Sequence, residues 1–187
     1  MNCALIIPAW APEDIFSTKT AGSQINYWQP LGTLYVAAAL QQAGHEVRFY
    51  NGAFMAHDEI MRQVQEYQPE FVGLYSTAFG WGKAKMTAAA IKQSLPGVFL
   101  TVGGPYPVAL QEKCIEDCPD IDSVVTGEGE ITVVEMLARL GSGADLDGVE
   151  GLAYRQGNEI KKNPPRPLIT DLDALPFPAR ELLGEAG

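Results

Sequence analysis

The sequence predicts an open α/β domain in which helices cover both faces of a five-stranded parallel sheet. Short apolar runs alternate with segments of helical periodicity, and five such pairs follow one another along the chain. The apolar runs carry few charges, as is typical of parallel strands buried on both faces. Right-handed crossovers between such strands place helices on both faces, so the sheet is expected to be doubly wound.

The expected strands are short and lie between turn signals. The first, CALIIP, is a continuous apolar run of the kind that occupies the centre of a parallel sheet. In chain order the expected strands cover residues 3–8, 45–51, 70–76, 98–104 and 121–127.

A helix is expected after each strand. In the first helix Leu31, Leu34, Tyr35 and Ala38 recur at helical spacing, and Gly44 supplies a C-terminal stop. The second carries acidic residues in its first turn, where the helix dipole favours them. In chain order the expected helices cover residues 30–44, 57–69, 83–95, 107–118 and 130–140.

The chain changes character after the fifth helix. We expect residues 1–143 to form the α/β domain and residues 144–163 an extension with a β-hairpin, since GLAYR and EIKKN flank a tight glycine turn. Residues 164–187 contain five prolines and read as an extended connector that ends in a short helix at ARELL. Because the connector has no core of its own, we expect it to lead toward a further domain.

The charge balance excludes some classes of partner. The formal net charge is −10, which argues against binding to nucleic acid or to an anionic membrane surface. No apolar stretch is long enough to span a bilayer, and the N-terminus lacks the basic region of a signal peptide. Three cysteines form no disulfide framework and fit a reducing compartment. The sequence therefore predicts a cytoplasmic location.

Ligands of open parallel sheets bind beyond the carboxyl ends of the strands. Ser76, Gly103 and Gly104 lie at two such ends, and small residues there leave a slot in which a ligand can approach the backbone. The loops expected at this edge cover residues 8–30, 76–82, 103–107 and 127–130.

The loop GEGE, residues 127–130, admits two interpretations. Its glycines and Glu130 can simply begin a helix, where the dipole favours an anion. Alternatively, Glu128 and Glu130 accept hydrogen bonds from a neutral ligand that is rich in amide or hydroxyl groups. A phosphate loop is excluded, because no lysine or arginine lies nearby and no phosphate-binding motif is present.

Other motifs give weaker signals. Residues 16–23 have the hydroxyl-rich and glycine-containing composition of a flavin phosphate loop, but they precede the first helix by many residues. Cys114 and Cys118 are expected to pack in the core rather than to bind a metal. His45 and His57 lie away from the ligand edge, so no catalytic set can be assembled.

Six motifs together resemble a known family. They are QPLGTLYVAAALQQAGHEVRFYN, PEFVGLYS, FLTVGGPYP, VVTGEGE, GLAYRQGNEIKKNPPRP and DLDALPFPARELL, in that order. The chain is similar to the N-terminal cobalamin (B12)-binding domain of the cobalamin-dependent radical S-adenosylmethionine (SAM) enzymes, such as the anaerobic porphyrin cyclases. The resemblance implies a flavodoxin-like, Rossmann-like fold that binds cobalamin. It also implies that this chain is a module of a methyltransferase or a cyclase, and that the module alone is not catalytic.

The resemblance also implies where the cofactor lies. Ser76, Gly103 and Gly104 would line a slot for its benzimidazole tail, Gly32 would approach the corrin, and Glu128 would meet the corrin edge. The full set of implied cofactor-binding residues is Trp10, Tyr27, Trp28, Leu31, Gly32, Ser76, Thr77, Gly103, Gly104, Pro105, Tyr106, Gly127, Glu128, Gly129 and Glu130.

The chain departs from the family pattern at two points. The D-x-H-x-x-G motif of other B12 modules is absent, so cobalamin is expected to bind base-off without a histidine lower ligand, with Trp10, Tyr27 or Trp28 covering that face. The C-x-x-x-C-x-x-C motif is also absent, so the iron–sulfur cluster and SAM are expected only in a catalytic domain outside this chain, joined in cis or in trans. Two alternatives stay open: a flavodoxin-like docking domain without a cofactor, and a flavin-binding electron carrier.

Overall fold

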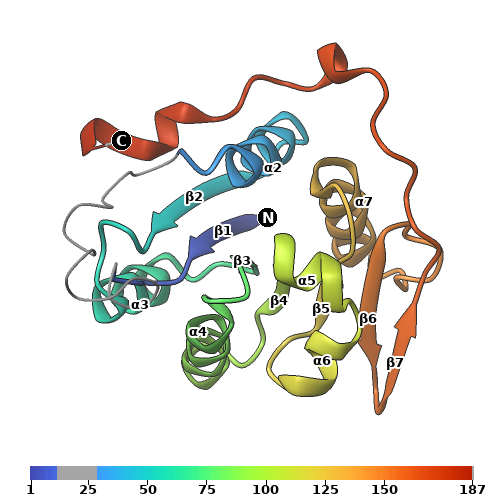
Figure 1. Cartoon of the computed structure of the whole chain (residues 1–187), viewed down its shortest axis with the longest axis horizontal. Helices are drawn as coiled ribbons and strands as arrows, with labels where there is room; N and C mark the ends of the chain where they lie inside the picture. The colour runs from blue at the N-terminus through green and yellow to red at the C-terminus, as the bar shows by residue number, and fades with distance from the viewer. Residues whose placement is uncertain (12–28, 187) are drawn as a thin grey trace.

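The computed structural model describes residues 1–11 and 29–186, which form one seven-stranded sheet with helices on both faces (Figure 1). The strand order is β2-β1-β3-β4-β5-β6-β7. The first five strands are parallel, and β6 and β7 are antiparallel to their neighbours. The strands are β1 (Asn2–Ile7), β2 (Glu46–Asn51), β3 (Phe71–Tyr75), β4 (Phe99–Gly103), β5 (Ser123–Val125), β6 (Leu152–Gln156) and β7 (Glu159–Lys162).

The order of the parallel strands confirms the predicted doubly wound, flavodoxin-like sheet. β1 pairs with β2 on one side and with β3 on the other, so the direction of winding reverses at β1. Such a reversal opens a crevice at the carboxyl ends of the strands that flank it. The fold thus places a ligand edge beside β1 and β3.

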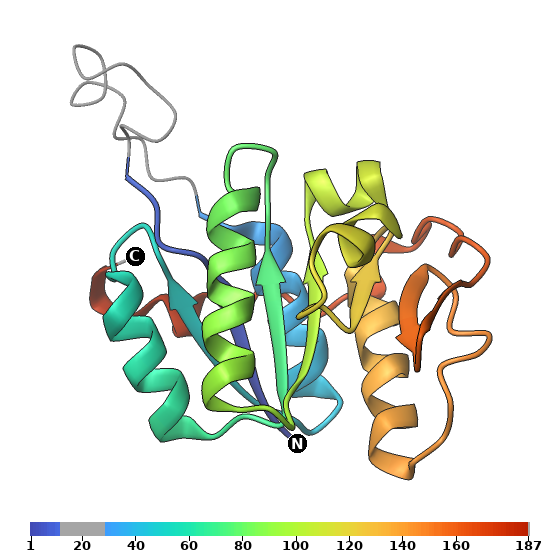
Figure 2. The same cartoon turned by 90° about the horizontal axis from the view of Figure 1, so that it is seen from below.

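Helices enclose a separate apolar core on each face of the sheet (Figure 2). α3, α4 and α6 cover one face, and α2 and α7 cover the other. Apolar side chains of the strands alternate between the two cores, as their twofold period requires. The helices are α2 (Leu31–Gln42), α3 (His57–Tyr67), α4 (Trp81–Ser94), α5 (Pro105–Leu110), α6 (Lys113–Asp117) and α7 (Gly129–Ser142).

The prediction of one helix over residues 107–118 is wrong. The chain forms two short helices there, α5 and α6, because Gln111 adopts a φ of 54° that ends the first of them. The break turns α6 so that Cys114 and Ile115 enter the core, where both are almost fully buried. The short helix expected at ARELL is present as a 3₁₀ helix, Arg180–Ala186, which is kinked at Gly184.

The predicted hairpin is present and extends the sheet. β6 pairs with the last parallel strand, with Tyr154 opposite Ser123, and β7 pairs with β6. The positive φ of Gly157 provides the turn between these two strands. The extension is therefore continuous with the α/β domain.

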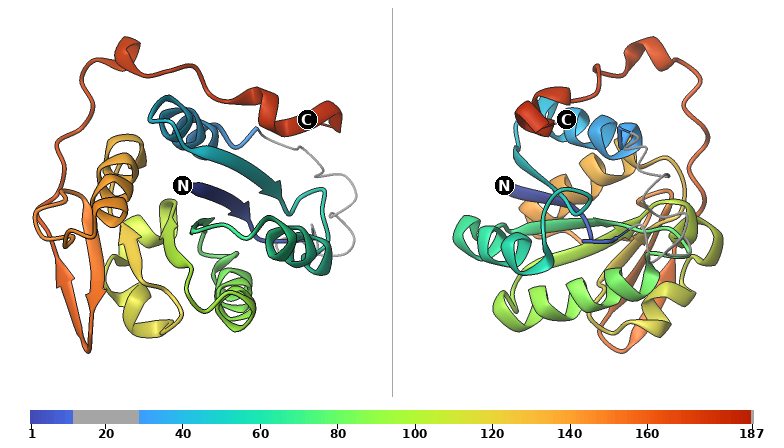
Figure 3. Two further views of the ribbon diagram at one scale, coloured as in Figure 1. Left: turned by 180° about the vertical axis from the view of Figure 1, so that it is seen from behind. Right: turned by 60° about the vertical axis from the view of Figure 1, so that its left-hand side comes forward.

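The proline-rich connector lies along the outer side of α7 and α2 (Figures 1 and 3). Asn163 begins this path, and its Nδ2 donates to the carbonyl oxygens of Leu146 and Val149 at 2.7 and 3.0 Å. At the far end the N–H of Ala179 donates to the carbonyl oxygen of Leu34 in α2, at 3.1 Å. The connector is thus attached to the domain near both of its ends.

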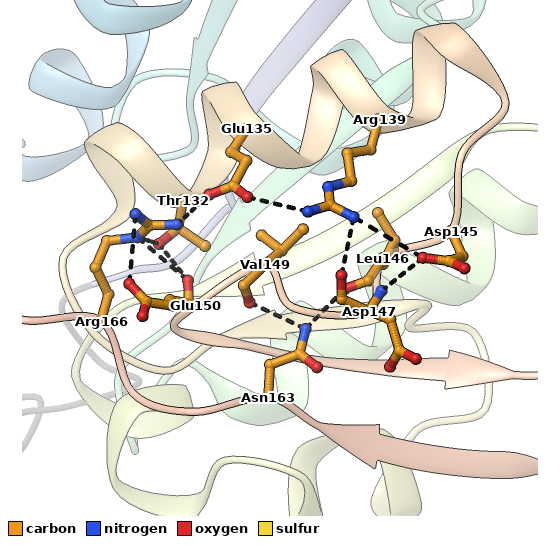
Figure 4. A network of polar contacts seen from close by, with 10 residues as sticks. All are labelled: Thr132, Glu135, Arg139, Asp145, Leu146, Asp147, Val149, Glu150, Asn163 and Arg166. Atoms are coloured by element: carbon orange, nitrogen blue, oxygen red, sulfur yellow. Dashed lines mark hydrogen bonds and ion pairs between the residues drawn. The ribbon is translucent and has the colours of Figure 1, made fainter.

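Arg166, close to the start of the connector, attaches it to α7 (Figure 4). Its guanidinium pairs with Glu135, and its Nε donates to Thr132 Oγ1 at 2.9 Å. Nε also lies 3.2 Å from the carbonyl oxygen of Glu150. Because Arg166 is mostly buried, these contacts hold the connector more firmly than an exposed ion pair would.

Candidate functional site

An apolar cavity of about 240 Å³ lies between the sheet and the pair of helices α2 and α7. Leu5, Phe71 and Val125 contribute from the strands, Val36 from α2 and Val133 from α7. The cavity reaches the carboxyl ends of β3, β4 and β5, next to the point where the winding reverses. Ligands of doubly wound sheets occupy this position.

Glycines create much of this space. A Cβ atom added at Gly32 or Gly127 would meet no other atom within 4 Å, and one at Gly103 would come no closer than 4.0 Å to any atom. Gly73 and Gly129 also line the cavity. Without side chains at these positions, the backbone forms apolar walls against which a flat group can lie.

Gly104 and Ser76 shape the rim without contributing side chains to the cavity. Gly104 has a φ of +106°, and a Cβ there would lie 2.7 Å from the carbonyl oxygen of Ser76, so no other residue fits well. Ser76 is buried, and its Oγ donates to the carbonyl oxygen of Thr77 at 3.0 Å. Its N–H donates to the carbonyl oxygen of Gly103, which joins the ends of β3 and β4.

Glu130 places a carboxyl group in the cavity wall. Its Oε2 is buried, and no hydrogen-bond partner for it lies among residues 1–11 and 29–186. Burial raises the pKa of Glu130 above its ordinary value of 4.5, and the nearby carboxylate of Glu128 adds to the effect. The backbone N–H groups of Glu130 and Gly129 lower the pKa without cancelling the rise. The wall of the mostly apolar cavity thus contains a carboxyl group, one oxygen of which has no partner among the described residues.

The raised pKa predicts a pH-dependent cost in stability. The folded chain holds a proton on Glu130 at pH values where the unfolded chain has lost it, so stability falls as the pH rises from 4.5 through the raised pKa. Glu130→Gln removes this cost. We expect the variant to have a higher melting temperature than the wild type at pH 8, and the difference to disappear near pH 4. A lower melting temperature at pH 8 would contradict the burial of this acid.

Glu128 contacts the connector, which the sequence did not indicate. It is the N-cap residue of α7, and its Oε2 accepts the backbone N–H of Ile169 at 2.6 Å. The carboxylate was expected to accept hydrogen bonds from a ligand, but one of its oxygens is already bonded within the chain. Glu128 therefore belongs both to the cavity lining and to the attachment of the connector.

Removal of the Glu128 carboxylate is expected to loosen the connector. A hydrogen bond to a charged acceptor contributes about 1.5–3 kcal/mol, so Glu128→Ala should speed hydrogen exchange at the Ile169 amide by roughly tenfold or more. Glu128→Gln keeps a carbonyl acceptor and serves as the matched control, with a smaller effect. Exchange resolved by NMR measures both. Unchanged exchange in Glu128→Ala would show that the contact does not hold this segment.

The structure gathers about half of the expected site residues around the cavity. Those that line it are Gly32, Gly103, Gly104, Gly127, Glu128, Gly129 and Glu130. Leu31 is exposed, and Thr77 Oγ1 instead accepts the N–H of Gly80 ahead of α4. Pro105 begins α5, and the ring of Tyr106 lies against that of Trp81 on the other face of the sheet. Tyr27, Trp28 and the segment 16–23 lie outside the described residues.

Trp10 lines a second, more open cavity of about 400 Å³. Phe54 and Met55 contribute to it from the loop after β2, and Lys83 contributes from α4. This second cavity lies beyond the ends of β1 and β2, so Trp10 is not part of the glycine-walled cavity.

Several lining residues were not predicted. Gly73, Tyr75 and Thr101 face the same side of the sheet as Gly103, because they alternate with residues of the opposite core along β3 and β4. Because every second residue of a strand faces the same side, their spacing from Gly103 in the sequence could have identified them. Val36 and Val133 could be recognised only once α2 and α7 were known to lie side by side.

Within residues 1–11 and 29–186, no group of three or more histidine, cysteine, aspartate or glutamate side chains could hold a metal ion. None of the helices described there is long and apolar enough to cross a membrane.

The fold and the cavity together define a class: doubly wound α/β domains with a ligand cavity at the carboxyl edge of the sheet. Residues 20–137, more than half of the chain, match the B12 binding domain family. The chain belongs to this family, and the resemblance inferred from its motifs is confirmed.

Two relatives illustrate the family. The chain is 33% identical over 156 residues to an uncharacterized methyltransferase of Pyrococcus horikoshii, covering 82% of this chain and 34% of that protein. It is 30% identical over 148 residues to the anaerobic magnesium-protoporphyrin IX monomethyl ester cyclase of Synechocystis sp., covering 77% of this chain and 30% of that protein. The chain thus spans about a third of the length of these relatives.

A solved structure has the same fold. The cobalamin-dependent S-adenosylmethionine radical enzyme OxsB, with aqua-cobalamin and S-adenosylmethionine bound, superposes with a TM-score of 0.75 at 19% identity. The match covers 98% of this chain and 25% of OxsB. It therefore extends to the hairpin and to the connector as well as to the α/β domain.

Proposed function

We propose that this chain is the cobalamin-binding module of a radical SAM enzyme of the methyltransferase or cyclase type. The observation that carries the proposal is the glycine-walled cavity at the switch point of a B12-binding domain. Its apolar lining suits a planar aromatic group such as the benzimidazole tail of cobalamin. Gly103 and Gly127 would leave room for the ring, and Val36 and Val133 would pack against it from the two helices.

The residues at this edge of the sheet also bear on how cobalamin would bind. The chain contains two histidines. His45 lies beside the amino group of Met1, at the amino end of the sheet, and His57 begins α3. Neither lines the cavity, which supports a base-off cofactor without a histidine lower ligand. Trp10, Tyr27 or Trp28 would then cover the lower face of the corrin.

The other rim residues would position the corrin. Leu31 is exposed at the first turn of α2, next to Gly32 in the cavity lining, where a flat macrocycle can approach the backbone. Thr77, Pro105 and Tyr106 would border it at the loops after β3 and β4. When bound, cobalamin supplies a cobalt centre for alkyl transfer, and the protein excludes water from its buried tail.

The catalytic domain is a separate part of this proposal. The matches cover only about a third of each relative, so most of each relative lies outside the part that resembles this chain. The connector that follows the hairpin runs back along α7 and α2. We place the iron–sulfur cluster and the SAM site in a domain that acts with this module in cis or in trans. The module alone would bind the cofactor without catalysing the reaction, in a soluble and cytoplasmic enzyme.

Titration with hydroxocobalamin under anaerobic conditions tests the function. We expect the purified chain to retain one equivalent of cobalamin on gel filtration, with the visible spectrum of a base-off corrinoid. Retention with a base-on spectrum would overturn the base-off mode while keeping the cobalamin function. No retained cobalamin, in either the oxidised or the reduced state, would overturn the function itself.

A further inference from the structure

Glu130 has two features that its role as a helix-entry residue does not explain: its place in the cavity lining and its buried, unpartnered oxygen. It lies in the first turn of α7 and lines the cavity, and its buried Oε2 has no partner among the described residues. A carboxyl oxygen buried without a partner costs about 1–3 kcal/mol or more, so such groups are rare unless a ligand satisfies them. The position of this oxygen is therefore informative about the ligand.

Among the described residues that line the cavity with Glu130, none is a lysine, an arginine or a histidine. The titratable residues that line the cavity with it are Tyr75 and Glu128, and burial raises the pKa of Tyr75. Glu128 is an anion whose Oε2 is engaged by the connector. Among the described residues, the backbone N–H groups of Gly129 and Glu130 lower the pKa of Glu130, but less than burial raises it. An acid in this setting favours a shared proton over an open negative charge.

We propose that Glu130 shares a proton with a ring nitrogen of the heterocycle held in the cavity, and that this hydrogen bond selects corrinoids that carry a nucleotide tail. The inference rests on the proposed function, since it assigns the occupant of the cavity to the benzimidazole of cobalamin. One nitrogen of that ring bears the ribose, and the other carries the lone pair that would otherwise coordinate cobalt. A hydrogen bond to Glu130 occupies this lone pair.

A carboxyl group suits this task better than other side chains. It can donate when the ring nitrogen is unprotonated and can accept when that nitrogen carries the proton, so the pair holds one proton in either form. The low polarity of the lining strengthens such a bond. Glu130 would thus act as a positioning residue that holds the base away from the metal.

The test compares cobalamin with cobinamide, which has the same corrin but lacks the nucleotide that bears the benzimidazole. Glu130→Leu should lower the affinity for cobalamin about tenfold and leave the affinity for cobinamide unchanged. Glu130→Gln keeps a donor and should bind cobalamin within about threefold of the wild type. Glu116→Gln, which changes an exposed glutamate on α6, is the matched control and should alter neither affinity.

The pH dependence provides a second readout. The contribution of the tail is measured as the dissociation constant of cobinamide divided by that of cobalamin. In the wild type this ratio should fall as the pH rises above the raised pKa of Glu130. In Glu130→Gln the ratio should stay constant, because the amide does not titrate. A structural role of Glu130 would affect cobinamide as much as cobalamin.

The outcomes separate the two proposals. Wild-type protein that binds neither corrinoid overturns the proposed function and this inference together. Wild-type protein that binds cobalamin and cobinamide equally well, or a Glu130→Leu variant that weakens both to the same extent, overturns this inference alone. Loss of cobalamin affinity with retained cobinamide affinity supports it and also shows that the variant is folded.

Discussion

Replacement of Gly103 by leucine is expected to abolish the binding of cobalamin and to leave the fold intact. A Cβ at this position meets no atom closer than 4.0 Å, and the residue lines the cavity, so the new side chain enters the space proposed for the benzimidazole. We expect the affinity to fall by more than about a hundredfold, because a filled cavity cannot hold the ring. The free energy of unfolding should change by no more than about 1 kcal/mol. Equilibrium binding and urea denaturation measure the two effects.

Gly97→Leu is the matched control for this experiment. Gly97 is exposed before β4, and a Cβ there also meets nothing within 4 Å, but it lies away from the cavity. This variant should bind cobalamin as the wild type does. If Gly103→Leu binds cobalamin with unchanged affinity, the ligand does not occupy the glycine-walled cavity.

Replacement of Gly52 by alanine is expected to have the largest effect on stability. A Cβ at this position would lie 2.3 Å from the backbone nitrogen of Ala9, which is a contact with main chain rather than with a flexible side chain. Gly52 is fixed there by two hydrogen bonds: its N–H donates to the carbonyl oxygen of Ile7, and its own carbonyl oxygen accepts the N–H of Trp10. The ends of β1 and β2 must therefore separate, at a cost of about 3–5 kcal/mol.

Gly82→Ala is the control for a glycine-to-alanine replacement that causes no steric clash. Gly82 lies in the first turn of α4, and its added Cβ would meet nothing within 4 Å. Its free energy of unfolding should change by less than about 1 kcal/mol. Similar values for the two variants, from urea denaturation, would contradict the close approach of the two strands at Gly52.

The alternation of short apolar runs with segments of helical periodicity was enough to predict the parallel part of the sheet. The apolar runs and helical periods fall where β1 to β5 and the longer helices lie, because each is set by burial on one or both faces. The break between α5 and α6 was not predictable in this way. It depends on a positive φ at Gln111, a residue type that rarely signals such a turn.

The site could be predicted only in part, because some of its residues depend on which residues of neighbouring strands and segments lie side by side. Gly103 and Gly104 were identified because small residues at strand ends are visible in the sequence. Gly73 was missed because its importance depends on pairing: it lies beside Leu5 of β1 and Thr101 of β4, and that alignment places it beneath the cavity. The partner of Glu128 was missed for a similar reason, since Ile169 is 41 residues away along the chain.

The hairpin that extends the sheet also determines which strands lie at its edges. The apolar parallel strands are enclosed between β2 on one side and β7 on the other. Both edge strands carry charge: β2 contains Glu46 and Arg48, and β7 contains Lys161 and Lys162. Charged edge strands, lysine-bearing ones above all, disfavour pairing with a strand of another molecule. The hairpin therefore protects the uncharged strand β5 from self-association, which matters in a domain whose central strands are almost entirely apolar.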